Sequence, residues 1–371
     1  MTFAIITGTR PEIIKLFPIM KLFSENAVDY KFIHTGQHFD YELSVKFIEE
    51  FGIRRPDYNI ILTKCAELPQ EQQTAEIMRK IGDIFRNEFF PSLVVIEGDT
   101  NSVLASALAA VKSNIPIAHL EAGLRSKDWK SFEEHNRRIV DCVADILFAP
   151  TSESANNLKM EHVHGDVHIV GNTVMDAIKL CLQSDENCSN VNNNILKYVK
   201  PKINSHFVLV TLHRAENVDN RDFLRHVLTA LSNSKHTYIF PMHPRTSKRI
   251  REFGLENLVT KQIIVTNPVG YSDFLRLLRM CMFVITDSGG VQEEITSPFI
   301  NKRAIVLRKY TERPESIETG HAMLCKAEKN QILSAIKKIE KATEITTIQS
   351  PYGSGNSAEK IASILKKTSY A

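Results

Sequence analysis

Short runs of apolar, largely β-branched residues recur along the chain, and the stretch between one run and the next is long enough for a helix. In the first half, strands are expected near residues 3–8, 30–35, 93–97, 115–120, 146–149 and 167–170. In the second half, they are expected near 207–212, 237–241, 263–266, 283–286 and 304–307. Helical periodicity lies between them, as in PEIIKLFPIMKLF and DFLRHVLTALS. Continuous apolar strands alternating with helices are typical of parallel sheets covered on both faces.

These elements predict an α/β protein with two Rossmann-like, doubly wound parallel-sheet domains. The first domain is expected over residues 1–173 and the second over 174–355. The polar, Asn-rich stretch CLQSDENCSNVNNNILKYVKPKINS follows this seam and has the pattern of neither element. A last helix, at about 356–371, is a candidate to pack back on the first domain, which the pattern alone does not establish.

Composition narrows the class of protein. The chain has 371 residues, of which 43% are apolar and 24% charged, and a net charge of only +3, with basic and acidic residues interleaved. A dedicated nucleic-acid binder would gather its basic residues on one face or tail, so nucleic acid is not expected as a partner. No stretch reaches the length of a membrane span, and the six cysteines never form a C-x-x-C pair. We therefore expect a cytoplasmic protein with reduced thiols and no membrane partner.

Polar residues gather directly after the expected strands, where the chain passes into the next helix. In the first domain these are Thr9, Arg10 and Glu12, then Asp99 and Thr100, then Glu121 and Arg125. In the second domain they are His213 and Arg214, His243 and Arg245, and Ser288, Gly289 and Gly290. Ligands of open parallel sheets bind outside the carboxyl ends of the strands. Polar residues at the strand ends of both domains therefore predict a ligand in a cleft between the domains.

The first strand leads into a helix through Gly8-Thr9-Arg10-Pro11-Glu12, which holds one glycine where nucleotide-binding loops usually hold two or three. This turn places Arg10 and Lys15 near a helix N-terminus, where the macrodipole disfavours a cation. Two interpretations are open. Arg10 pairs with a neighbouring carboxylate such as Glu12, or both cations are positioned for an anionic ligand.

Two other turns also have a purely structural interpretation. Asp99 and Thr100 are equally well explained as caps of the helix that follows them. The segment Ser288-Gly289-Gly290-Val291-Gln292-Glu293-Glu294 is compatible with a capping box. Its paired glycines favour a different function, because they let backbone amides approach an anion closely at a helix N-terminus.

The helix SFEEHNRRIVDCVA places Glu133, Arg137 and Asp141 along one face. In an isolated helix such a stripe is usually a set of solvated ion pairs. Here the helix follows a strand end that carries Glu121, which favours a place in the cleft. His213, beside an arginine at a strand end, favours a phosphate or general-acid role over that of a core histidine.

The chain contains no Walker A sequence and no clustered Cys/His set, so neither a metal nor a cofactor is expected. The motifs nevertheless identify a family. GTRPEIIKL, EGDTNSVLA, HLEAGLRS, EEHNRR, VGNTVMDA, LHRAENVDN, HPRT, DSGGVQEE and TERPES occur in the order and spacing of the UDP-N-acetylglucosamine 2-epimerases. The sequence resembles this family from end to end, and its GTRPE-xxK opening resembles the non-hydrolysing branch.

The resemblance implies a GT-B-like architecture with an interdomain cleft, a homodimer and a UDP-sugar substrate. It also implies reversible epimerisation at C2 of UDP-N-acetylglucosamine to UDP-N-acetylmannosamine, in which UDP is eliminated to a bound 2-acetamidoglucal and then added again. The product would be a precursor of polysaccharides or other glycans. No metal or nicotinamide takes part in this chemistry.

The family's functional residues carry over to matching positions of this chain. The resemblance implies catalytic roles for Asp99, Glu121, Glu133 and His213, with proton transfer at C2 assigned to the three carboxylates as a group. It implies substrate binding by Arg10, Lys15, Arg137, Phe274, Ser288, Gly289, Gly290, Glu294 and Arg308. Bacterial relatives are activated by a second UDP-sugar, and a similar regulatory set here would contain Gln37, His38, Arg214 and His243.

The chain departs from the family pattern at two points near the expected cleft. Phe132 replaces the usual proline before the E-E-x-N-R helix, and Lys309 follows Arg308 where an aspartate is usual. These departures leave a modified substrate, of the UDP-2,3-diacetamido-glucuronate type, as an alternative. A hydrolysing 2-epimerase and a GT-B glycosyltransferase are further alternatives.

Overall fold

The computed structural model describes residues 2–37, 48, 51–60, 68–187, 206–342, 345 and 349–368. The chain divides into two compact units, of which the first comprises Met1–Leu180 with Tyr352–Ala371 and the second Cys181–Pro351. Helix α7 (Val174–Asn187) begins just after the expected seam, and the two units divide within this helix. Every helix among the described residues is too short or too polar to span a bilayer.

The first unit contains a seven-stranded sheet in the order β3-β2-β1-β4-β5-β6-β7, and all its strand pairs are parallel. Its strands are β1 (Phe3–Thr7), β2 (Tyr30–His34), β3 (Tyr58–Asn59), β4 (Leu93–Glu97), β5 (Ile117–Leu120), β6 (Ile146–Ala149) and β7 (Asp166–Ile169). Its other helices are α1 (Arg10–Glu25), α3 (Gln70–Asn87), α4 (Asn101–Lys112), α5 (Phe132–Val143), α6 (Ser152–Met160) and α16 (Ser357–Lys367). This is the doubly wound topology that the strand and helix pattern predicts.

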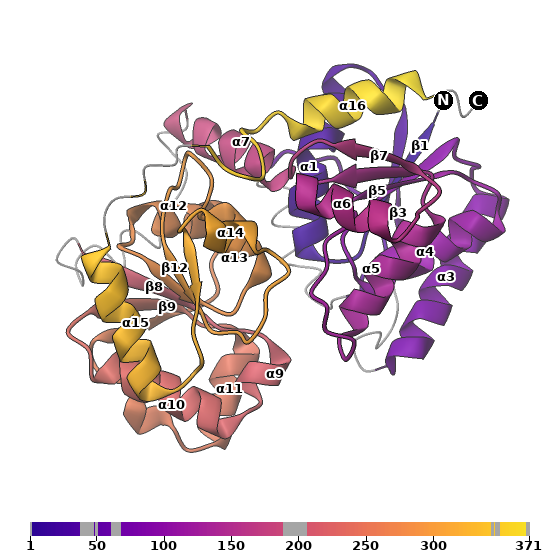
Figure 1. Ribbon diagram of the computed structural model, residues 1–371. Helices are drawn as coiled ribbons and strands as arrows, with labels where there is room; N and C mark the ends of the chain where they lie inside the picture. Colours follow the sequence, from indigo (N-terminus) through magenta and orange to yellow (C-terminus); the bar gives the residue numbers. More distant parts are fainter. Residues whose placement is uncertain are drawn as a thin grey trace. The chain divides into compact units, whose positions relative to one another are not determined.

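The two faces of this sheet are covered by different helices (Figure 1). One core cluster joins alternate strand residues such as Ile96 and Ile117 to α3, α4 and α5. On the other face, Phe3 of β1 packs against Phe23 of α1, with ring centroids 5.1 Å apart. Because successive strand residues point to opposite faces, Glu97 points towards α1 and His119 towards α5. This alternation decides which helix supplies polar partners to Glu97 and which supplies them to His119.

The last helix, α16, belongs to the first unit and packs beside α1. The Asp176 carboxylate accepts hydrogen bonds from the backbone N–H groups of Ser357 and Ala358, both at 3.1 Å. Asn172 N–H donates to the Tyr352 carbonyl at 2.8 Å. These bonds satisfy N–H groups at the start of α16 and attach the C-terminal segment to residues 172–176.

The second unit contains a six-stranded parallel sheet in the order β10-β9-β8-β11-β12-β13. Its strands are β8 (Phe207–Thr211), β9 (Thr237–Pro241), β10 (Ile263–Thr266), β11 (Val284–Thr286), β12 (Ala304–Val306) and β13 (Ala322–Leu324). Its helical segments are α9 (Ala215–Val218), α10 (Arg221–Ser232), α11 (Pro244–Glu252), the 3₁₀ turn η3 (Glu256–Leu258), α12 (Tyr271–Met280), α13 (Gly289–Glu294), α14 (Glu315–Glu318) and α15 (Lys329–Lys341). Two parallel-sheet units of this kind confirm the expected fold class.

Two strands, β3 and β13, are absent from the expected set. β3 has two residues and β13 three, and each lies at the edge of its sheet. Such short edge strands carry too few alternating positions to produce a pattern in the sequence. They are formed by pairing with a neighbouring strand, which the local sequence does not encode.

Gly123, in the turn after β5, is held in a conformation that only glycine tolerates there. Its φ is +84°, and an added Cβ would lie 2.1 Å from the Ser154 carbonyl oxygen. That oxygen belongs to the backbone and cannot rotate away as a side chain would. The turn that follows Glu121 therefore requires glycine for both its φ and its space.

We expect Gly123→Ala to lower the free energy of unfolding by about 3 kcal/mol, because backbone strain and overpacking add. Gly52→Ala is the matched control: its φ is also positive, at +62°, but nothing lies within 4 Å of an added Cβ. This control should cost only about 1 kcal/mol. Urea unfolding of both variants measures the difference, and equal losses would show that the contact with Ser154 is not limiting.

Candidate active site

Lys15, Glu97 and Glu121 form a buried ionic cluster at the carboxyl ends of three neighbouring strands. Lys15 lies on α1, which follows β1, while Glu97 ends β4 and Glu121 follows β5. Lys15 Nζ lies 2.5 Å from Glu121 Oε1 and 3.0 Å from Glu97 Oε1. All three residues are buried. The Lys15 ammonium, for which the family resemblance implies substrate binding, therefore contacts two carboxyl groups.

Glu121 is held in place by both its backbone and its side chain. Its φ is +62°, a left-handed conformation that costs a non-glycine residue of order 1 kcal/mol and often marks a functional position. Asn172 Nδ2 donates to Glu121 Oε1 at 2.5 Å, and Asn172 Oδ1 accepts from Val174 N–H at 2.9 Å. The Glu121 carboxylate is thus oriented by an ammonium and an amide, each fixed by other contacts.

Glu12 turns back onto the first strand-to-helix junction and does not extend towards solvent. Its carboxylate accepts hydrogen bonds from Gly8 N–H at 2.6 Å and Thr9 Oγ1 at 2.7 Å. Burial raises the pKa of Glu12 to about 7, and the hydrogen bonds from Thr9, Gly8 and Thr100 only partly oppose this. Arg10 is exposed on the first turn of α1. The Glu12 carboxylate is therefore hydrogen-bonded within its own turn, whereas Arg10 faces solvent.

His119 is fully buried between two acceptors. Its Nδ1 lies 2.8 Å from Asp141 Oδ1, and its Nε2 lies 2.8 Å from the Gly98 carbonyl oxygen. A carbonyl oxygen can only accept, so Nε2 carries a proton. Burial acts to raise the pKa of Asp141, but hydrogen bonds and charges from His119 and Arg125 outweigh it and lower the pKa. Asp141 is therefore ionised, and its carboxylate and the Gly98 carbonyl oxygen fix the orientation of the His119 ring.

The His119 side chain connects the turns that follow β4 and β5. Gly98, next to Asp99, donates its N–H to the Leu120 carbonyl and accepts from His119 through its own carbonyl. Asp141 accepts the Gly123 N–H at 3.1 Å. Arg125 Nη2 lies 2.7 Å from Asp141 Oδ2 and completes the network. The relative positions of Asp99 and Glu121 thus depend on a fully buried ion pair.

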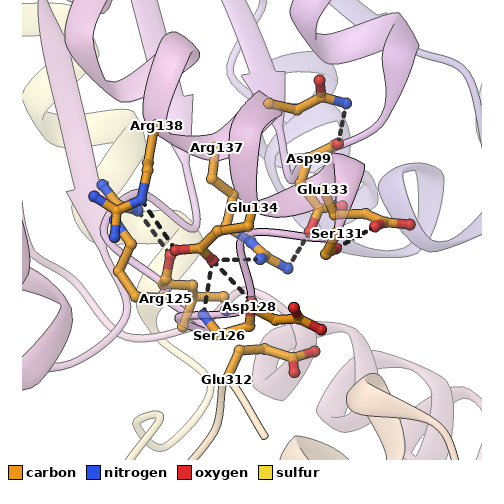
Figure 2. Close-up of polar contacts among 12 residues, drawn as sticks. Asp99, Arg125, Ser126, Asp128, Ser131, Glu133, Glu134, Arg137, Arg138 and Glu312 are labelled. Carbon is orange, nitrogen blue, oxygen red and sulfur yellow. Dashed lines mark hydrogen bonds and ion pairs between the residues drawn. The ribbon is translucent and has the colours of Figure 1, made fainter. Parts of the chain in front are cut away.

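Asp99 and Arg137 form an ion pair, and Arg137 also lies 3.4 Å from Glu134 (Figure 2). Glu134 accepts the Ser126 N–H at 2.8 Å and pairs with Arg138 at 3.1 Å. Arg137, Glu134 and Asp141 are buried. The alternative of a solvated ion-pair stripe on this helix is therefore wrong for Arg137 and Asp141.

Glu133, in contrast, is exposed on the first turn of α5, where its carboxylate accepts from Ser131 Oγ at 2.5 Å. A helix advances by about 100° per residue, so Glu134 points into the unit while Glu133 points out. Among the expected catalytic carboxylates, Glu121 lies in the buried cluster with Lys15, and Asp99, whose side chain is 26% exposed, pairs with the buried Arg137. Thr100 caps α4 by accepting from Val103 N–H at 3.4 Å, so the capping interpretation is confirmed for Thr100, whereas Asp99 pairs with Arg137.

The expected regulatory residues are only partly described. Gln37 is buried, and its Oε1 accepts from Ser102 N–H at 2.8 Å and Ser102 Oγ at 2.7 Å. His38 lies outside the described residues. In the second unit, the rings of His213 and His243 have centroids 6.4 Å apart. His243 also caps α11, since its Nδ1 accepts from Arg245 N–H at 3.2 Å.

In the second unit, Asp287 fixes the turn that carries His213 and Arg214. Asp287 follows β11 and is fully buried. Its carboxylate accepts both backbone N–H groups, from His213 at 3.1 Å and from Arg214 at 3.1 Å, and also Asn217 Nδ2 at 3.1 Å. His213 Nδ1 lies 3.5 Å from Asp287 Oδ1, and the ring remains partly exposed. This arrangement places a partly exposed histidine ring at the end of β8.

Ser288, Gly289 and Gly290 begin α13, and the two glycines serve different purposes. A Cβ on Gly289 would lie 2.7 Å from Arg313 Nη1, so this glycine makes room for an internal arginine. Nothing lies within 4 Å of a Cβ on Gly290, which leaves space beside that amide. The Ser288 side chain makes no capping hydrogen bond, so the capping-box alternative is wrong.

The other residues expected to bind substrate in the second unit lie on α12, α13 and the segment after β12. Tyr271 Oη donates to Glu294 Oε1 at 2.9 Å, and Phe274, one turn further along α12, is half-buried. Arg308 Nη1 lies 2.8 Å from Glu312 Oε2. Burial and the charges of Arg214 and Arg313 lower the pKa of Arg308, while Glu312 opposes this.

Several residues of the site do not stand out in the sequence, and Glu97, Asp287 and Asn172 are the clearest cases. The available signal was an acidic residue that closes an apolar run, as in LVVIE and FVITD. Asn172 gives no such signal, because its partner Glu121 lies 51 residues earlier. Among the described residues, no group of three or more His, Cys, Asp and Glu is arranged to hold a metal ion.

The fold and these strand-end sites define a GT-B-like α/β enzyme. The sequence model of the UDP-N-acetylglucosamine 2-epimerase family matches residues 20–366. A UDP-N-acetylglucosamine 2-epimerase of Methanococcus maripaludis is 39% identical over 97% of both chains. The crystal structure of the Methanocaldococcus jannaschii UDP-GlcNAc 2-epimerase in complex with UDP-GlcNAc and UDP has a TM-score of 0.88 and 36% identity, and covers 99% of this chain and 100% of that one. The chain belongs to the UDP-N-acetylglucosamine 2-epimerase family.

One relative has a different substrate in its name. The UDP-2,3-diacetamido-2,3-dideoxy-D-glucuronate 2-epimerase of Pseudomonas aeruginosa is 35% identical over 98% of both chains. Relatives of this chain are therefore named as 2-epimerases of more than one UDP-sugar.

Proposed function

We propose that this protein catalyses the reversible epimerisation of UDP-N-acetylglucosamine at C2 to UDP-N-acetylmannosamine, without hydrolysis of the nucleotide sugar. Family membership supports the reaction class. The observation that carries the chemistry is the oriented carboxylate of Glu121, which Lys15 and Asn172 hold at the strand ends of the first unit. Removal of a weakly acidic C2 proton requires such a fixed, partly desolvated base.

The proposed reaction has two balanced halves. In the elimination, the C2 proton moves to a carboxylate, the C2–H electrons form the C1–C2 double bond, and the C1–O bond breaks with its electron pair leaving on UDP. In the re-addition, an acid protonates C2 from the other face while a UDP oxygen attacks C1. Each half therefore needs a base or acid at C2 and a group that stabilises the departing diphosphate.

The described residues suit these roles. We assign proton transfer to Asp99 and Glu121, with Glu133 kept as a candidate because the family resemblance includes it. His213, whose backbone Asp287 fixes, is assigned to the departing diphosphate. Arg10, Lys15, Arg137 and Arg308 supply positive charge, Ser288, Gly289 and Gly290 supply amides, and Phe274 and Glu294 contact the nucleoside. Gln37, His38, Arg214 and His243 remain the proposed regulatory set.

Incubation with UDP-N-acetylglucosamine in ²H₂O tests the reaction. We expect deuterium at C2 of both UDP-sugars without any acceptor, because the proton exchanges with solvent through a carboxyl group. Glu121→Gln should lower this exchange by roughly 10²–10⁴-fold, the usual contribution of a general acid or base, and leave UDP binding nearly unchanged. The control Glu88→Gln changes an exposed glutamate just beyond α3 and should have no effect.

Protium retained in both substrate and product would exclude the elimination route. The same assay separates the other candidates. A hydrolysing enzyme would release free N-acetylmannosamine, and a glycosyltransferase would require an acceptor. The diacetamido-glucuronate substrate of the Pseudomonas aeruginosa relative is the second candidate, and a parallel reaction with that UDP-sugar ranks the two by kcat/KM.

We further propose that the protein is a cytoplasmic homodimer that supplies a precursor for polysaccharide synthesis. The resemblance to the family supports the dimer, and the nucleotide-sugar substrate supports a cytoplasmic location. Sedimentation velocity should give the mass of two 42.1 kDa chains. A single species with the mass of one chain at micromolar concentration would contradict the dimer.

A further inference from the structure

Glu97 is a buried carboxyl group without a role in the proposed reaction. It ends β4, points towards α1 and is 1% exposed. Lys15 Nζ lies within 3.0 Å of a carboxyl oxygen of each of Glu97 and Glu121, so the two carboxyl groups share one ammonium in a buried site. Two ionised carboxylates this close to each other repel, and one ammonium neutralises only one of them. The arrangement therefore favours a proton on the pair.

The position of Lys15 indicates which carboxyl group is ionised. Its ammonium is 2.5 Å from Glu121 Oε1, at hydrogen-bonding geometry, and 3.0 Å from Glu97 Oε1. Asn172 donates to the same Glu121 oxygen. Glu97 Oε1, in contrast, is buried and makes no hydrogen bond within the described part of the chain. A buried oxygen that has an ammonium nearby but no aligned hydrogen bond is tolerated better on a neutral carboxyl than on a carboxylate.

The surrounding charges favour the same assignment. The charged groups that face Glu97 are Lys15 and Glu12 on α1 and Glu121, which follows β5 in the chain. Burial is the largest influence and raises the pKa of Glu97 well above its ordinary value, Lys15 opposes this, and Glu121 and Glu12 add to the rise. If Glu97 were also ionised, two negative charges would share the single Lys15 ammonium. Burying this uncompensated charge would cost free energy.

We propose that Glu97 is a positioning residue that holds a proton at neutral pH and donates it in a hydrogen bond to Glu121. Glu121 is thereby kept as the ionised member of the pair, with its orientation fixed from Glu97, Lys15 and Asn172. No proton leaves the pair in this role. The inference rests on the proposed function, since Glu121 is the carboxylate that it positions for proton transfer at C2.

Glu97→Gln is the decisive variant, because an amide copies a protonated carboxyl: its N–H donates to Glu121 and its oxygen faces Lys15. The kcat for C2 exchange should stay within about threefold of wild type at neutral pH, with KM unchanged. Glu97→Leu has a similar size but no hydrogen-bonding groups, and its kcat should fall at least tenfold with a smaller change in KM.

The pH profile separates positioning from packing. In the wild-type enzyme, kcat should fall at alkaline pH as Glu97 ionises, repels Glu121 and competes for Lys15. Glu97→Gln should lack this fall, because an amide cannot ionise. Glu12→Gln is the matched control, since it removes a second buried carboxyl facing Glu97 and should retain the fall. Loss of the fall in Glu12→Gln but not in Glu97→Gln would overturn the proposal, as would a loss above 100-fold in Glu97→Gln at neutral pH.

A substrate-free measurement keeps the proposal testable if a variant fails to fold or the enzyme proves inactive on the sugars tried. In the wild-type protein labelled with ¹³C at the glutamate side-chain carboxyls, one buried carboxyl should titrate at alkaline pH. Its signal should show the protonated form at neutral pH and be absent from Glu97→Gln. A fully ionised pair at neutral pH would overturn the proposal. An inactive enzyme with a protonated Glu97 would instead refute the proposed function alone.

Discussion

The contact of the Lys15 ammonium with two buried carboxyl groups is the interaction on which the first unit's site depends. Removing charges from water costs several kcal/mol per ion, and the cost is recovered only where geometry and hydrogen bonding are complete. Glu121, in a left-handed backbone conformation, meets this requirement with a second donor, because Asn172 Nδ2 donates a hydrogen bond to its carboxylate. The same requirement leaves Glu97, which has fewer donors, as the group on which a proton is best placed.

A second buried ion pair supports the first from the opposite face of the sheet. His119 and Glu97 lie on neighbouring strands but point to opposite faces, so α5 supplies the partner of one and α1 the partner of the other. The His119–Asp141 pair fixes the turns at Gly98 and Gly123, and these turns carry Asp99 and Glu121. The relative positions of Asp99 and Glu121 therefore depend on the buried polar contacts that join the two strand ends, and not on loop conformation alone.

In the second unit, a single buried carboxylate fixes the turn after a neighbouring strand. Asp287 is buried at the end of β11 and accepts the backbone N–H groups of His213 and Arg214, which lie beyond the neighbouring strand β8. In the second unit an acidic residue at one strand end thus fixes the turn after the neighbouring strand. In the first unit the corresponding turns are fixed by His119 of β5 and Asp141 of α5.

The sequence by itself determined the alternation of strands and helices and the parallel sheets, because these follow from the local pattern of apolar and polar residues. It also determined the polar residues at the strand ends and the family, because both are read from motifs along the chain. Asp99, Glu121 and His213 are proposed as site residues on the same basis. Only the tertiary structure showed that Glu133 faces solvent while Glu134 is buried, since the rotation of a helix against its sheet is set by packing. Only the tertiary structure joined Glu97, Lys15, Glu121 and Asn172, because burial brings together charges that lie far apart in the chain and decides which of them keeps its proton.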